Sequence, residues 1–60
     1  MKMITIEQIQ LAEVRTKGFI AHDNMKNLLE QMIRMKAKEI RWFSLPESDR
    51  EILSWVGCDK

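Results

Sequence analysis

Cys58 is the only cysteine and His22 the only histidine in a chain of 60 residues. A chain this short buries too little surface for a core of its own to be more than marginally stable, and small domains usually add disulfides, a metal or a partner. One cysteine excludes a disulfide within the chain, and one cysteine with one histidine is too few for a structural zinc site. We therefore expect a single domain over residues 1–60 with no metal and no cofactor, stabilised by helix packing or self-association.

The composition is typical of a folded globular protein. Hydrophobic residues make up 45% of the chain and charged residues 32%, which is the range of globular proteins. The formal net charge of +1 gives no overall attraction to nucleic acid or to a membrane surface. Because we find neither a signal peptide nor a long apolar run, we expect cytoplasmic localisation and no membrane partner.

Helix-end signals predict an all-α fold made of three helices, the first over about residues 5–17. Thr5 and Gln8 have the spacing of a capping box, in which each side chain accepts a backbone N–H of the other residue. Gly18 suits the left-handed position that often follows a helix. Apolar and polar residues also alternate at the start of the chain, so a strand remains the alternative for residues 2–10.

The second predicted helix, over about residues 24–43, is the longest, and Pro46 closes it. Its apolar residues cover roughly half of the circumference, which is more than two short helices of the same chain can bury. A second copy of this helix would cover that face, so we expect a helical homodimer. The residues predicted to self-associate are Leu28, Leu29, Met32, Ile33, Met35 and Ile40. A short third helix is predicted over about residues 46–56, with Gly57 as its stop.

Catalytic chemistry is not indicated by this sequence. Cys58 and His22 are the obvious nucleophile and base, but we expect residues 58–60 to fray, which leaves no fixed geometry between them. Glu47 and Glu51 are neighbours on the third predicted helix, but a chain this small has little room for a cleft that would shift the pKa of either carboxyl group. We therefore predict that the protein is not an enzyme.

Charge is distributed unevenly along the chain. Residues 26–41 carry five bases and two acids, whereas residues 47–60 carry four acids and two bases. Arg34, Lys38 and Arg41 share the polar face of the predicted second helix. These three residues are the candidates for contact with nucleic acid phosphates or with an acidic partner.

The opening residues 2–6 (Lys-Met-Ile-Thr-Ile), followed by a helix, Gly18 and a longer helix, resemble a ribbon-helix-helix repressor over residues 1–40. Such proteins are short dimers that read the major groove of DNA with a paired strand. The resemblance implies a small dimeric DNA-binding transcriptional regulator. The sequence departs from this pattern at Glu7. On the outer side of the strand its carboxylate would face the DNA phosphates, and two negative charges repel each other.

Two functions follow from these observations. The first is a small, non-enzymatic helical interaction protein that forms a homodimer through its central helix and regulates a partner protein. In size and composition such a chain resembles the accessory proteins of bacteriophages and mobile elements. The second is the DNA-binding regulator, which makes nucleic acid the less favoured partner.

Overall fold

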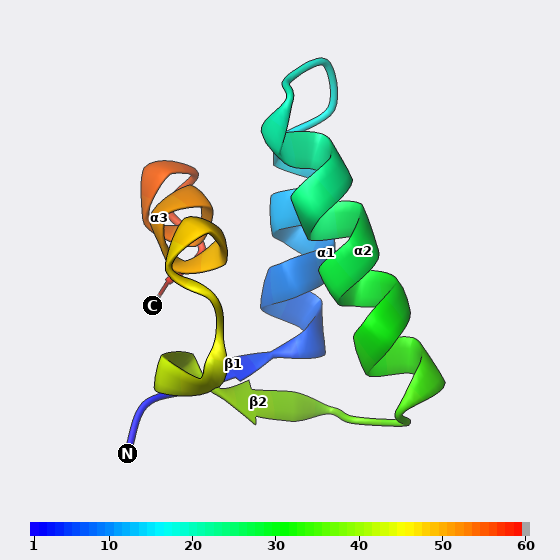
Figure 1. The fold of residues 1–60 in the computed structure, drawn as a ribbon, viewed down its shortest axis with the longest axis vertical. Helices are drawn as coiled ribbons and strands as arrows, with labels where there is room; N and C mark the ends of the chain where they lie inside the picture. The colour runs from blue at the N-terminus through cyan, green and yellow to red at the C-terminus, as the bar shows by residue number, and fades with distance from the viewer. Residues whose placement is uncertain (60) are drawn as a thin grey trace.

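The computed structural model describes residues 1–59, which form three α-helices, a short 3-10 helix and one antiparallel sheet of two strands. In chain order the elements are β1 (Met3–Thr5), α1 (Ile6–Arg15), α2 (Ala21–Arg34), β2 (Glu39–Arg41), η1 (Trp42–Ser44) and α3 (Glu47–Trp55). The helices α1 and α2 stand side by side, the strands lie across one end, and α3 stands beside them (Figure 1). The predicted all-α class is therefore wrong, because the fold is a small, mostly helical mixture of helix and strand.

The sheet joins the start of the chain to its middle. Ile4 pairs with Ile40 at the centre of the antiparallel register. Two further backbone bonds extend the ladder: the Ile6 N–H donates to the Lys38 carbonyl over 2.8 Å, and the Trp42 N–H donates to the Lys2 carbonyl over 3.0 Å. The two alternatives for residues 2–10 are thus both present in part, because a strand of three residues leads directly into α1.

A capping box begins α1, as the sequence predicts. The Thr5 N–H donates to Gln8 Oε1 over 2.8 Å, and the Gln8 N–H donates to Thr5 Oγ1 over 3.2 Å. The helix ends at Arg15, two residues before its predicted end, and Gly18 has a positive φ of 91° in the turn that follows. The two hydrogen bonds between Thr5 and Gln8 therefore fix the residue at which β1 ends and α1 begins.

The predicted long central helix is wrong, because α2 ends at Arg34. Lys36 adopts the left-handed conformation with a φ of 55°. The Lys36 N–H donates to the Ile33 carbonyl over 3.0 Å, and the Ala37 N–H donates to the Met32 carbonyl over 2.9 Å. These two bonds form a Schellman motif, which ends a helix and turns the chain away from its axis. The residues that follow then pair with β1 instead of extending the helix.

Replacing Lys36 by glycine is expected to raise the free energy of unfolding by about 1 kcal/mol, because glycine has no Cβ to strain in the left-handed region. Urea denaturation followed by circular dichroism measures this change. Lys38→Gly is the matched control, because Lys38 is equally exposed but has no positive φ. A destabilised Lys36→Gly variant would contradict the left-handed end of α2.

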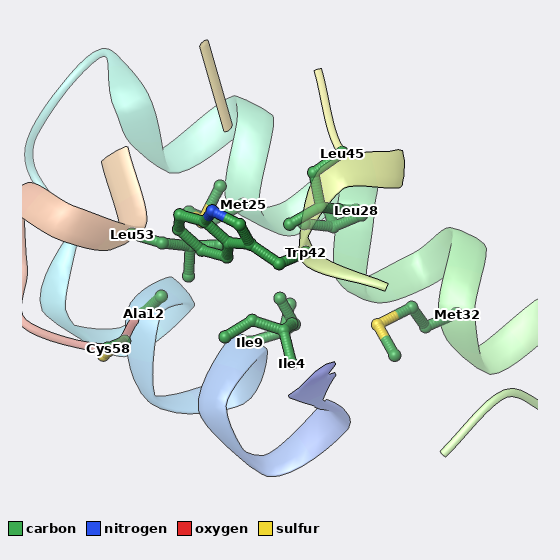
Figure 2. Close-up of a cluster of buried hydrophobic side chains, with 10 residues drawn as sticks. All are labelled: Ile4, Ile9, Ala12, Met25, Leu28, Met32, Trp42, Leu45, Leu53 and Cys58. Carbon is green, nitrogen blue, oxygen red and sulfur yellow. The ribbon is translucent and has the colours of Figure 1, made fainter. Parts of the chain in front are cut away.

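The hydrophobic core lies between the three helices and the inner side of β1. Its buried residues are Ile4, Ile9, Ala12, Met25, Leu28, Met32, Trp42, Leu45, Leu53 and Cys58. Figure 2 shows the indole of Trp42 crossing the middle of this cluster toward Leu53. Leu28 and Met32 of α2 are thus covered by the same chain.

Cys58 is held in place, contrary to the fraying that we predicted for residues 58–60. Cys58 is only 4% exposed, and residue 60 lies outside the described residues. The predicted third helix is confirmed as α3, and Gly57 follows it with a positive φ of 75°. Arg15 of α1 then donates from Nη1 to the Val56 carbonyl over 2.7 Å, which ties this turn to the rest of the fold.

Candidate functional site

The aromatic side chains of the protein gather around α3. Trp42 and Phe43 lie in η1, directly before α3, and Trp55 is the last residue of that helix. Phe19 comes from the turn between α1 and α2, yet its ring centroid lies 5.2 Å from that of Trp55 at an interplanar angle of 85°. This is the edge-to-face geometry that aromatic pairs prefer. The fold therefore brings together rings that are far apart in the sequence.

Three of these four rings are exposed to solvent. Phe19 is 54% exposed, Trp55 is 62% exposed and Phe43 is 77% exposed, whereas Trp42 belongs to the core. Large aromatic side chains at the surface are a feature of binding sites, because water solvates their faces poorly. We call Phe19, Phe43, Arg50 and Trp55 the aromatic surface.

Arg50 connects the two ends of the aromatic surface. Its guanidinium carbon lies 5.8 Å from the ring centroid of Phe43, within the range of a cation–π contact. It also lines an open depression of about 590 Å³ together with Trp42, Glu47, Glu51, Ser54 and Trp55. The Nε atom of Arg50 is buried without a hydrogen-bond partner among the described residues. The side chain is therefore partly desolvated before any partner arrives.

A second charged residue of α3, Asp49, is buried at 8% exposure. It is the third residue of the helix, where a carboxylate usually accepts the N–H of the capping residue. The capping residue here is Pro46, which has no N–H to donate. Burial raises the pKa of the Asp49 carboxyl above its ordinary value of 3.8.

Asp49→Asn is expected to raise the free energy of unfolding at neutral pH by on the order of 1 kcal/mol, because it removes a buried charge. The pKa of the Asp49 carboxyl is higher in the folded protein than in the unfolded chain, where it has the ordinary value of 3.8. As the pH rises from 3.8 through the folded pKa, the unfolded chain loses its proton first, so the free energy of unfolding falls. Urea titrations at neutral pH and at about pH 3 measure the effect, which should vanish in acid. An equal gain at both pH values would contradict a charge-based cause.

The residues predicted to self-associate do not form one face. Leu28 and Met32 are buried in the core, Leu29 and Ile40 are half-buried, and Ile33 and Met35 are 56% and 61% exposed. Ile40 lies in β2 and not in the helix. The structure therefore leaves Ile33 and Met35 as the exposed members of the set.

The three candidate basic residues also lie on different elements. Arg34 is the last residue of α2, Lys38 precedes β2, and Arg41 ends β2, so they do not share a helical face, although all three are exposed. A ribbon-helix-helix dimer needs its strand to pair with a second copy, whereas β1 pairs with β2 of the same chain. DNA binding therefore stays a prediction that this fold does not test.

Of the residues considered for catalysis, Glu47 and Glu51 both line the open depression beside Trp55, although little room for a cleft was expected, and His22 makes no hydrogen bond with Cys58 within residues 1–59. His22 Nε2 lies 2.9 Å from Glu13 Oε2, a contact that joins α2 to α1. Among residues 1–59, no three His, Cys, Asp or Glu side chains are placed to hold a metal ion. Within the same residues, none of the helices combines the length and the apolar character needed to cross a membrane.

Comparison with known proteins gives no relative for this chain. No family model, no curated protein and no solved structure matches it. What the protein does must therefore be inferred from its own surface.

Proposed function

We propose that this chain is a small, non-enzymatic interaction protein that binds a partner protein through its aromatic surface and thereby regulates that partner. The observation that supports this most is the grouping of three exposed aromatic rings with a partly desolvated arginine. Aromatic residues and arginine are enriched at the centre of protein interfaces, where a few of them supply most of the binding energy.

The exposed aromatic rings and Arg50 indicate which chemical groups the partner surface must carry. Trp55 projects a large ring beside an open depression, so the partner needs an apolar pocket or ridge that covers this ring. Arg50 needs an anionic group, because a guanidinium makes its strongest hydrogen bonds with carboxylates. Glu47 and Glu51 line the same depression, so we expect an apolar partner surface that carries an Asp or Glu opposite Arg50 and a Lys or Arg opposite the two acids.

Affinity capture with three forms of the full chain tests this function. The wild type, Trp55→Ala and Asn27→Ala serve as baits in the same lysate, and Asn27 is an exposed polar residue of α2 that lies outside the aromatic surface. We expect a protein that the wild type and Asn27→Ala retain and that Trp55→Ala loses. Equal retention by all three baits would overturn the assignment of the surface.

Self-association remains a separate prediction, now carried by Leu29 and Ile33, which lie one turn apart on α2. Sedimentation equilibrium should give a mass that rises toward twice the 7.2 kDa of the chain as its concentration increases. Ile33→Asp should return that mass to 7.2 kDa, because a carboxylate cannot be buried in an apolar interface without a counter-charge. A wild-type chain that stays at 7.2 kDa at every concentration would show that this prediction is wrong.

A further inference from the structure

A second hollow lies between the end of α2, the strand β2 and the start of α3. Its volume is about 320 Å³, at the small end of the range for ligand pockets. The walls are largely apolar and include Met32, Met35, Ile40 and Leu45. The ionisable residues that line it are Asp49 and Glu39, both acidic, and none of its lining residues is basic.

Asp49 is the unusual member of this lining. The residue is 8% exposed, and its carboxyl makes no hydrogen bond or ion pair with any residue in the described part of the chain. A carboxylate on a largely covered residue loses part of its hydration, and a cation beside it compensates for that loss. The hollow therefore offers an unpaired acid beside apolar walls, which is complementary to a cation on an apolar stem.

We propose that this hollow binds a small primary alkylammonium ion, with the ammonium group paired to Asp49 and the hydrocarbon chain packed on Met32, Met35 and Ile40. The limited volume favours a stem of a few carbons over a larger ligand. Glu39 lines the same hollow and adds negative charge near it.

This site is distinct from the aromatic surface. Residues two positions apart point to opposite sides of a helix, so Asp49 faces away from Glu51. Glu51 lines the depression next to Trp55, and Asp49 lines the hollow on the other side of α3. Trp55→Ala should therefore leave amine binding unchanged, which makes the two proposals independent.

Amide-resolved NMR titration of the full chain with three ligands of equal stem length tests the proposal. The ligands are n-hexylammonium, n-hexanol and n-heptanoate, each of which joins a six-carbon chain to a head group of different charge. We expect n-hexylammonium to shift the amides of Met32, Ile40 and Asp49 and to bind about tenfold tighter than n-hexanol, as one charge-assisted bond provides. Equal affinity for the three ligands, or shifts confined to other residues, would overturn the proposal.

Two variants test whether the carboxylate of Asp49 is the source of the preference for n-hexylammonium over n-hexanol. Asp49→Asn keeps the side-chain shape and should reduce the affinity for n-hexylammonium to that for n-hexanol. Glu51→Gln removes a charge from the opposite side of α3 and should keep the preference intact. The wild-type comparison does not depend on the folding of either variant. An Asp49→Asn protein that retained the full ammonium preference would contradict the role given to this carboxyl.

Discussion

Ile4→Ala is expected to lower the free energy of unfolding by about 2–5 kcal/mol, the range for truncating a fully buried aliphatic side chain. Ile4 is 0% exposed and pairs with Ile40 at the centre of the sheet. Its removal leaves a cavity between the strands and the helices that no neighbour can fill completely. Because domains of this size are marginally stable, much of the chain should unfold at room temperature.

Ile20→Ala is the matched control for this prediction, because it makes the same chemical change at a side chain that is 95% exposed. Its effect should stay within about 0.5 kcal/mol. Urea denaturation monitored by circular dichroism compares the two variants with the wild type. If both changes had similarly small effects, Ile4 would not be the core residue that the fold requires.

Trp55→Ala is expected to weaken binding of the partner protein by at least about 30-fold, which corresponds to the 2 kcal/mol or more typical of a central interface tryptophan. The free energy of unfolding should fall by only about 1 kcal/mol, because the change removes the edge-to-face contact with Phe19 and little buried surface. The large loss of affinity with a small loss of stability is what separates a binding role from a structural one.

Isothermal titration calorimetry with the partner recovered by affinity capture measures this loss. Val14→Ala is the control, because Val14 is also exposed and apolar, at 56%, but lies on α1 outside the aromatic surface. We expect the Kd of Val14→Ala to stay near the wild-type value. A Trp55→Ala chain that bound as well as Val14→Ala would remove the aromatic surface from the interface.

Local signals in the sequence predicted the parts of the fold that local hydrogen bonds determine. The capping box of Thr5 and Gln8 is present, and Gly57 follows α3 in the left-handed conformation. Such ends can be read from the sequence because their hydrogen-bond partners lie within a few residues of each other.

The parts that were missed depend on contacts between distant residues. The end of α2 carries no glycine, because Lys36 takes the left-handed position, so nothing in the local sequence marks it. Residues 39–41 form a strand because Ile40 pairs with Ile4, which is far away in the sequence. Tertiary contacts of this kind override helix propensity.

The aromatic surface was missed for a similar reason. Phe43 falls within the predicted second helix and Trp55 within the predicted third, and only the packed fold shows that both are exposed. One signal was available in advance, because Trp55 lies four residues after Glu51 and therefore shares the charged side of its helix. The contact between Phe19 and Trp55 depends on tertiary packing and has no counterpart in the local sequence.

Site-specific photo-crosslinking tests the binding role of the aromatic surface most directly. A benzoylphenylalanine replaces Trp55 in one full-length chain and Asn27 in another, and each is irradiated with the captured partner. The account predicts a covalent product of chain and partner from position 55 and none from position 27. A product formed equally well from both positions, or from position 27 alone, would contradict it.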